Sequence, residues 1–245
     1  MRREHALSPE EFRAVWDNKP VLRAVYRDYY ARIARWCQPG LRLEVGAGSG
    51  NLRDELPAVV SSDIVHSPFL DVVADAQRLP VADGSVATIV GVDVLHHIEY
   101  PRRFLAEARR ALRPGGRVVL VEPAITPVSW VVFKLGHPEP VDLSADPLAD
   151  GEPDPEKHPF DSNQALPTLV AGRHRDRVER DLGLLVAHVE RFSLVAYPLS
   201  GGFRRWSLMP ASLVNTVLGL ERSVERMLGP LMGFRLLLVI ERPVA

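Results

Sequence analysis

The chain has 245 residues, of which 46% are hydrophobic and 25% are charged, and its formal net charge is −1. These values suit one globular domain and argue against binding along a nucleic-acid backbone, because such binding needs a surplus of basic residues. No apolar run reaches the roughly 20 residues that cross a bilayer, and no apolar segment follows the first basic residues as in a secretory signal. A single cysteine, Cys37, excludes an internal disulfide, so we expect a cytoplasmic protein without a membrane span.

The first forty residues carry a helical pattern. Ser8 is suited to cap a helix that begins at Pro9, with Glu11 as its capping-box partner. Apolar residues then recur on one helical face, at Val21, Val25, Tyr29 and Ile33. The string "QPG" ends this region at Gly40.

From residue 41 onward, short apolar runs alternate with glycines, aspartates and helical segments. Five runs are predicted to be strands: Leu41–Val45, Val59–Asp63, Asp71–Ala74, Val86–Asp93 and Arg117–Glu122. Helices are predicted after the first and the fourth of them, the latter at Pro101–Leu112. This alternation indicates a parallel, doubly wound α/β sheet. The link between the second and third strands is shorter than a parallel crossover needs, so either the third strand is rudimentary or its helix has shrunk to a turn.

The second half of the chain begins with an insertion after the fifth strand. Residues 137–164 are rich in proline and carboxylates and are predicted to form an acidic loop. A helix around Ala165–Leu182, a strand around Val189–Tyr197 and an amphipathic helix near Pro210–Leu228 follow. The string "GFRLLLVIERP" supplies a final strand, which gives seven strands with a helical insertion, residues 205–230, before the last.

The string "GAGSG" at residues 46–50 follows the first predicted strand. It lacks the spacing and the lysine of a phosphate-binding P-loop. It also lacks the third glycine of a dinucleotide fingerprint, because Asn51 stands at that position. What remains is an acidic-x-Gly-x-Gly-x-Gly pattern that begins at Glu44.

An acid and three further motifs follow this loop in order. Asp63 closes the second apolar run, "ADAQRLP" (74–80) and "DVLHHI" (93–98) follow the third and fourth, and "RALRPGG" (110–116) leads into the fifth. Together with the glycine loop, they resemble the motifs of class I S-adenosylmethionine-dependent methyltransferases of the small-molecule branch. The resemblance covers roughly residues 35–125.

The resemblance implies a Rossmann-like, seven-stranded fold that binds S-adenosylmethionine and releases S-adenosylhomocysteine. It implies that the loop backbone lies against the methionine part, that an acid binds the ribose hydroxyls, and that residues after the second and third strands hold the adenine. The implied cofactor contacts are Glu44, Gly46, Ala47, Gly48, Asp63, Ile64, Asp75, Ala76 and Asp93. It also implies that residues 1–40 form a helical lid over the domain of residues 41–245, with Tyr30 contacting the substrate.

His96 and His97 follow the fourth strand, at the edge where open α/β sheets bind their ligands. Histidine titrates near neutrality and can take a proton from an attacking hydroxyl. Glu122 ends the neighbouring strand and could orient one imidazole. We therefore predict His97, His96 and Glu122 as catalytic residues, with His97 favoured and Glu122 as its partner. The alternative is a structural role, in which one histidine only hydrogen-bonds the backbone.

The acidic loop supplies further polar residues. Asp161 and Asn163 belong to a compact polar cluster and, with His137, are predicted to contact the substrate. No tight ligand spacing joins the histidines and aspartates of the loop, so no metal site is predicted.

The sequence as a whole predicts methyl transfer to a small-molecule acceptor, chiefly at oxygen, in a biosynthetic or glycan- or natural-product-modifying pathway. N- or C-methylation, including that of isoprenoid-like acceptors, and cofactor binding without turnover stay open as alternatives. No nucleic-acid partner is expected, and the protein is predicted to be a monomer or a homodimer. The amphipathic helix near residues 210–228 favours core packing or dimerisation over membrane attachment, because Glu221 and Glu225 would oppose anionic lipid.

Overall fold

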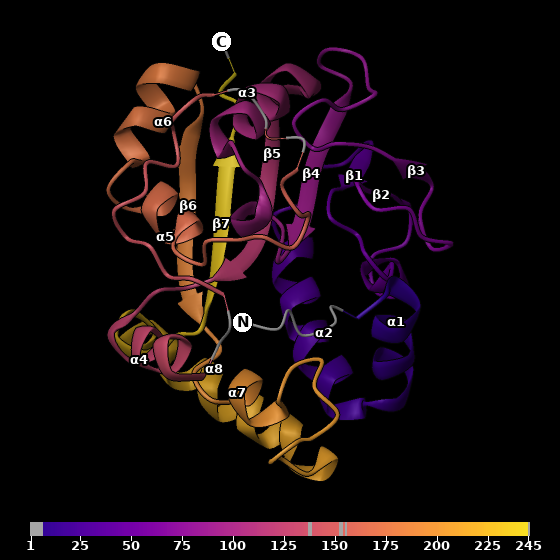
Figure 1. The fold of residues 1–245 in the computed structure, drawn as a ribbon, viewed down its shortest axis with the longest axis vertical. Helices are drawn as coiled ribbons and strands as arrows, with labels where there is room; N and C mark the ends of the chain where they lie inside the picture. Colours follow the sequence, from indigo (N-terminus) through magenta and orange to yellow (C-terminus); the bar gives the residue numbers. More distant parts are fainter. Residues whose placement is uncertain (1–6, 137–138, 152–153, 155, 245) are drawn as a thin grey trace.

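The computed structural model describes residues 7–136, 139–151, 154 and 156–244. Within these ranges one seven-stranded sheet has the order β3-β2-β1-β4-β5-β7-β6 (Figure 1). Its strands are β1 (Arg42–Glu44), β2 (Val59–Asp63), β3 (Val72–Val73), β4 (Val86–Val92), β5 (Leu112–Pro123), β6 (Leu185–Phe192) and β7 (Arg235–Glu241). β1 to β5 pair in parallel, whereas β7 lies antiparallel between β5 and β6.

The parallel register brings four acidic residues to one edge of the sheet. Glu44 of β1 lies beside Ser61 of β2 and Val90 of β4. Asp63 ends β2, Asp93 directly follows β4, and Glu122 lies next to the end of β5. Because the carboxyl ends of parallel strands meet at the same edge, these side chains surround one region.

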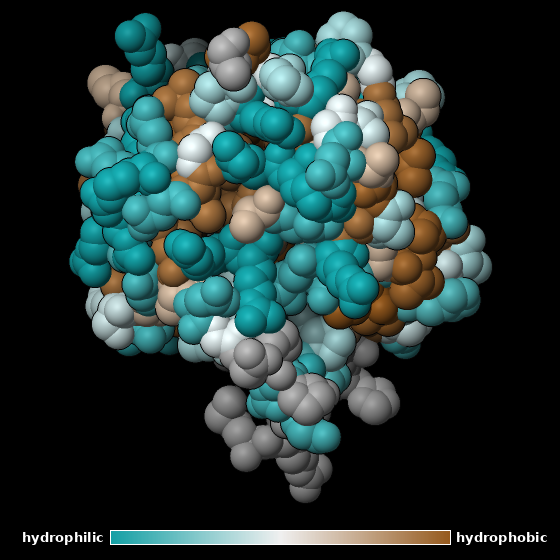
Figure 2. All heavy atoms as spheres, turned by 90° about the horizontal axis from the view of Figure 1, so that it is seen from above, coloured by the Kyte–Doolittle hydropathy of each residue, from teal (hydrophilic) through white to brown (hydrophobic). Residues whose placement is uncertain are grey.

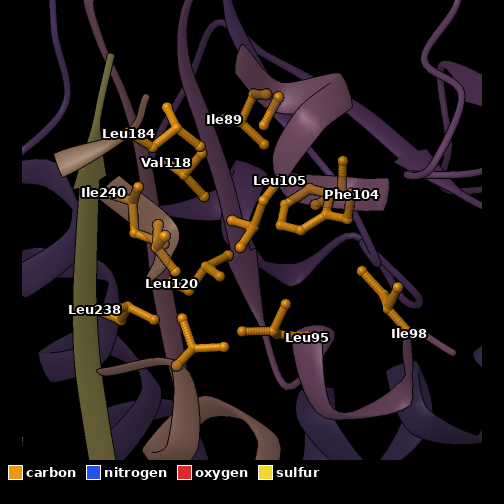
Figure 3. Close-up of a cluster of buried hydrophobic side chains, with 14 of the residues drawn as sticks. Ile89, Leu95, Ile98, Phe104, Leu105, Val118, Leu120, Leu184, Leu238 and Ile240 are labelled. Carbon is orange, nitrogen blue, oxygen red and sulfur yellow. The ribbon is translucent and has the colours of Figure 1, made fainter. Parts of the chain in front are cut away.

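Helices cover both faces of the sheet. One buried cluster joins α3 (Pro101–Ala111), α5 (Leu166–Ala171) and α6 (Arg175–Leu182) to the sheet, with Phe104 and Leu105 of α3 packed near Leu120 of β5 (Figure 3). A second cluster joins α2 (Pro20–Ala34), α7 (Ala196–Ser200) and α8 (Val214–Met232) to the other face. α4 (Pro127–Gly136) lies beyond the carboxyl end of β5 (Figure 1). The two clusters make the sheet the centre of the molecule.

The N-terminal helices have different roles. α1 (Pro9–Asn18) begins with the predicted capping box: the Ser8 amide donates to Glu11 Oε2 at 2.7 Å, and the Glu11 amide donates to Ser8 Oγ at 3.2 Å. α2 is part of the core, since Leu22, Val25 and Tyr29 are fully buried. α1 also contributes Trp16 to the same buried cluster, so the lid and the division of the chain at residue 40 stay a prediction.

Several predicted elements differ in the structure. The helix expected after β1 is wrong: only a single 3₁₀ turn, Asn51–Asp54, forms, because Pro57 and the start of β2 follow at once. The link from β2 to β3 contains no helix, and β3 has only two residues. The third strand is therefore rudimentary and the helix before it is also reduced to a turn.

The elements after the acidic loop also shift. The helix expected at Ala165–Leu182 is broken at Gly172 (φ −115°, ψ −100°) into α5 and α6. The sixth strand ends at Phe192 rather than Tyr197, because Ser193 adopts a positive φ of 57° and the chain then forms α7. α4 was not predicted, and the expected last helix extends to Met232.

A buried ionic network ties α2 to the second half of the chain. Arg32 binds Asp28 at 2.8 Å and Glu225 of α8 at 2.7 Å, and it also pairs with Glu190 of β6. Glu221 of α8 accepts a hydrogen bond from the backbone amide of Ala196 at 2.7 Å. Both acidic side chains of α8 therefore point inward.

The end of the molecule that carries the amino ends of the parallel strands is largely hydrophilic at its centre, with hydrophobic areas toward its sides (Figure 2). Within the described ranges, no helix has the length and apolar character needed to cross a bilayer.

Candidate cofactor and acceptor cleft

A cleft of about 1640 Å³ opens at the carboxyl edge of the parallel strands. This volume exceeds the roughly 300–1,000 Å³ of a pocket for one small ligand, so the cleft has room for a cofactor and an acceptor together. Every residue predicted to contact the cofactor lines it: Glu44, Gly46, Ala47, Gly48, Asp63, Ile64, Asp75, Ala76 and Asp93. His96, His97 and Tyr30 line it as well.

Two glycines of the loop serve different purposes. Gly46 has φ +67°, and an added Cβ would lie 2.6 Å from Val94 Cγ2, so packing alone requires glycine there. Gly48 has φ +51°, and an added Cβ would meet no protein atom within 4 Å. Because Gly48 lines the cleft, its open space is a cradle in which a ligand can approach the backbone closely.

Asp63 shapes the loop as well as the cleft wall. Its Oδ2 accepts the Gly48 amide proton at 2.8 Å, and its Oδ1 accepts that of Val65 at 2.9 Å. Each carboxylate oxygen can accept more than one hydrogen bond. Asp63 can therefore hold the glycine loop and still receive the two hydroxyl protons of a ribose.

The far end of the cleft presents an apolar surface beside a carboxylate. Ile64 is 57% exposed and lines the cleft, a placement that suits stacking against a flat base. Asp75 Oδ1 accepts the Gln77 amide proton at 2.8 Å. No hydrogen bond from the described residues reaches Asp75 Oδ2, which leaves this oxygen available to an amino group.

Glu44 lies deeper, at the end of β1. Its side chain is buried and accepts a hydrogen bond from Ser61 Oγ at 3.1 Å. Burial raises the pKa of Glu44 to about 8, because desolvation penalises the carboxylate. A cationic ligand group at this place would favour the ionised form.

The raised pKa of Glu44 predicts a pH-dependent stability. The folded protein keeps this proton up to about pH 8, whereas an unfolded glutamate releases it near 4.5. The stabilisation is therefore complete below pH 4.5 and is lost as the pH rises toward 8. We expect the Glu44→Gln variant, compared with the wild type by urea unfolding, to gain relative stability through this window. Parallel stability curves for the two proteins would contradict the prediction.

Asp93 is held at the end of β4 by a buried arginine. It adopts φ 56°, its Oδ1 pairs with Arg235 of β7, and its Oδ2 accepts a hydrogen bond from the Tyr26 hydroxyl at 3.3 Å. The Arg235 guanidinium lies 3.9 Å from the centre of the Tyr197 ring. Sequence reasoning missed Arg235, because its distance along the chain from every motif hides the contact.

His96, which lines the cleft, forms a buried pair with Glu122, which does not line it. Glu122 Oε2 contacts His96 Nδ1 at 2.7 Å, while its Oε1 accepts the amide protons of Val94 and Leu95 at 3.0 and 2.7 Å. Burial opposes protonation of His96, but the hydrogen bond and charge of Glu122 outweigh it and raise the His96 pKa. Glu122 is thus the partner of His96, and the predicted pairing with His97 is wrong, because the turn at Leu95–His97 directs only the first imidazole toward β5.

His97 has a different environment. Its ring centre lies 4.1 Å from that of His96, and no hydrogen-bond partner among the described residues reaches its buried Nδ1. Burial and the neighbouring His96 lower the pKa of His97 to about 4. The imidazole of His97 is therefore neutral at physiological pH and is a weaker base than that of His96.

Among the described residues, two groups bring potential metal-binding atoms within 4.8 Å of one another: His96, His97 and Glu139, and Asp93, His96 and Glu122. Several of these atoms already have protein partners. Glu139 Oε2 accepts hydrogen bonds from Ser162 Oγ at 2.8 Å and Gln164 Nε2 at 2.6 Å. Both groups can be held together without an ion.

The residues predicted to contact the substrate lie in different places relative to the cleft. Tyr30 is buried beside Trp16 and lines the cleft, and His137 lies outside the described residues. Asn163 and Asp161 do not appear among the cleft-lining residues, because the loop uses their side chains: Asn163 Oδ1 accepts the Ala165 amide proton at 3.0 Å, and Asp161 Oδ2 that of His158 at 3.2 Å.

Two polar residues that were not predicted to contact the substrate lie at the cleft instead. Glu139 and Gln164 line the cleft. Gln164 directly follows Asn163 of the polar cluster, whereas the proline-rich context of Glu139 gave no indication that it faces the histidines.

Comparison with known proteins agrees with this geometry. A family model described as a methyltransferase domain matches residues 43–120. A demethylmenaquinone methyltransferase of Beutenbergia cavernae is 36% identical over 112 residues, 40% of this chain and 46% of that protein. An uncharacterised protein in a transposon of Streptomyces fradiae is 32% identical over 154 residues, 63% of this chain and 36% of that protein. The chain thus spans less than half the length of these two relatives.

Solved structures share the fold. A methyltransferase described as a possible histamine N-methyltransferase from Thermotoga maritima has a TM-score of 0.53 at 13% identity, covering 95% of this chain and 94% of that one. An S-adenosylmethionine-dependent methyltransferase from Archaeoglobus fulgidus has a TM-score of 0.52 at 15% identity, covering 89% and 94%. Residues 43–120 thus match a methyltransferase domain, and the seven-stranded sheet has the Rossmann-like fold of class I methyltransferases.

Proposed function

We propose that this protein transfers a methyl group from S-adenosylmethionine to a hydroxyl of a small-molecule acceptor, in a biosynthetic or glycan- or natural-product-modifying pathway. The observation that carries the proposal is the buried His96–Glu122 pair, of which His96 lines the same cleft as the glycine loop. The raised pKa of His96 suits a group that takes up a proton near neutrality. Oxygen acceptors need such a group more than amines do.

The residues present fit the cofactor. Gly48 leaves room for a chain pressed against the loop backbone, Asp63 can receive the ribose protons, and Ile64 offers a surface to the adenine. Glu44 and Asp93 would lie near the cationic amino and sulfonium groups. When bound, S-adenosylmethionine supplies an activated methyl group. The protein's task is then to hold the acceptor in line with that methyl group and to exclude water.

His96 is the proposed proton acceptor. Glu122 fixes its ring by accepting from Nδ1. Nε2, which lies 3.6 Å from Glu139 Oε2, is the atom proposed to take the hydroxyl proton. Neutral His97 and Gln164 would contact the acceptor from the same side. We also propose a cytoplasmic location for the enzyme, in keeping with its single, half-buried thiol, Cys37.

Calorimetry tests the first step. We expect S-adenosylmethionine and S-adenosylhomocysteine both to bind the protein, and the Asp63→Ala variant to bind them more weakly. Absence of binding to either compound would overturn the proposal. Given binding, a screen of acceptors with labelled methyl groups distinguishes the alternatives: label on nitrogen or carbon would replace O-methylation, and binding without turnover on any acceptor would leave a cofactor-binding protein.

A chelator tests whether a metal takes part. Because Glu122 binds His96 directly, and Ser162 and Gln164 hold Glu139 in place, we expect dialysis against a chelator to leave turnover unchanged. Loss of turnover that a single divalent cation restores would contradict this prediction and assign the ion to His96, His97 and Glu139.

A further inference from the structure

α4 exposes an unusual amount of apolar surface. Within Pro127–Gly136 only Ser129 and Phe133 are buried. Val128, Val131 and Leu135 lie on the opposite face of the helix at helical spacing, and they are 37%, 46% and 84% exposed. A short helix that hides so little of its apolar side from water marks an interaction site.

α8 also exposes apolar side chains next to α4. α4 packs against α8, and both helices lie beyond the carboxyl edge of the sheet (Figure 1). The outward side of α8 carries large apolar side chains that are more than half exposed, namely Leu220, Met227 and Leu231. We call Val128, Val131, Leu135, Leu220, Met227 and Leu231 together the α4–α8 surface.

The exposed charged residues of α4, α8 and residues 201–213 are basic. They are Lys134, Arg204, Arg205, Arg226 and Arg222, of which Arg222 pairs with Asp28 and Arg204 donates a hydrogen bond to the Gly136 carbonyl. The acidic loop of residues 137–164 follows α4 directly in the sequence. α4 and residues 201–213 contain no acidic residue. The sequence-based objection that Glu221 and Glu225 would oppose anionic lipid is wrong, because Ala196 and Arg32 hold these carboxylates in the interior.

This arrangement of charges favours one of two binding partners for the surface, a second copy of the chain or a lipid bilayer. A second copy of the chain would bring Lys134 and Arg226 against basic residues of its own kind, and such contacts repel. An anionic bilayer presents phosphates to the basic residues and an acyl boundary to the apolar ones. Trp130, which is 40% exposed, adds the aromatic character that favours the membrane–water interface.

The surface also adjoins the cleft. Val132 of α4 lines the cleft, as do Arg204 and Trp206. A molecule dissolved in a bilayer beneath the α4–α8 surface would therefore face the entrance to the site.

We propose that the α4–α8 surface docks this protein on anionic lipid bilayers, with Lys134, Arg204, Arg205 and Arg226 binding headgroup phosphates and the apolar side chains entering the acyl boundary. This role is peripheral, goes beyond methyl transfer, and does not depend on it.

Flotation with lipid vesicles tests the proposal in the absence of cofactor and acceptor. We expect the full chain to float with phosphatidylglycerol-containing vesicles, to bind pure phosphatidylcholine far less, and to dissociate as salt is added. The Leu135→Glu variant and the Lys134→Glu/Arg226→Glu variant should each bind anionic vesicles roughly tenfold or more weakly.

The matched control is Leu41→Glu, which places the same charge on a leucine that is 42% exposed before β1; it should float like the wild type. All variants should keep their affinity for S-adenosylmethionine, so failure of docking is distinct from failure of the methyltransferase proposal. Wild-type protein that does not float with anionic vesicles overturns the inference. So does a dimer, measured by sedimentation, that Leu135→Glu converts to monomer without any vesicle binding.

Discussion

Replacement of His96 by asparagine is expected to lower kcat by roughly 10²- to 10⁴-fold and to leave the affinity for S-adenosylmethionine unchanged. The asparagine amide can still donate to Glu122 in place of Nδ1, so the buried carboxylate keeps a partner. What the variant loses is Nε2, the atom proposed to take the acceptor proton. Steady-state kinetics and calorimetry with S-adenosylmethionine measure the two effects separately.

His97→Asn is the matched control for this variant. Because burial and His96 lower the pKa of His97 to about 4, its loss should raise KM for the acceptor more than it lowers kcat. A His96→Asn enzyme that retains full turnover, next to a His97→Asn enzyme that has none, would assign proton transfer to His97 instead. Glu122 is a poorer probe, since its removal also leaves the amides of Val94 and Leu95 without their acceptor.

Gly48→Ala is expected to weaken cofactor binding roughly 10- to 100-fold, because the added methyl group would occupy space that the loop keeps open for the ligand. Alanine at φ +51° also costs about 1 kcal/mol of stability. Calorimetry measures the change in affinity, and urea unfolding measures the change in stability.

Gly84→Ala separates these two effects. Gly84 has φ +63°, and an added Cβ there also meets nothing within 4 Å, but Gly84 is not among the residues that line the cleft. Both variants should lose similar stability, and only Gly48→Ala should lose affinity. Equal affinities for the two variants would show that the ligand does not approach Gly48.

The end of each parallel strand was the most predictable part of the site. Glu44, Asp63 and Asp93 each directly follow or close a short apolar run, and parallel pairing then brings them to one edge whatever the details of the helices. The short sequence motifs around these three residues were sufficient to predict that they line one site. The two-residue β3 and the missing helix before it were also visible, as a link too short for a crossover.

Contacts between distant segments were not predictable in the same way. Arg235 reaches Asp93 across 142 positions of the chain, and Glu139 faces the histidines from within a loop that carries no periodic pattern. Which of two adjacent histidines meets Glu122 depends on one 3₁₀ turn. A sequence pattern indicates that both are near the cleft but does not fix the direction of either ring.

The position of β7 has a consequence for how the protein is made. β6 pairs only with β7 among the described strands, and β7 lies between β5 and β6. During synthesis, β5 therefore has an open edge and β6 has no strand to join until residues 235–241 leave the ribosome. From the emergence of β5 until β7 follows it, the nascent chain thus exposes an unpaired hydrophobic edge, and we expect it to depend on chaperones during this interval.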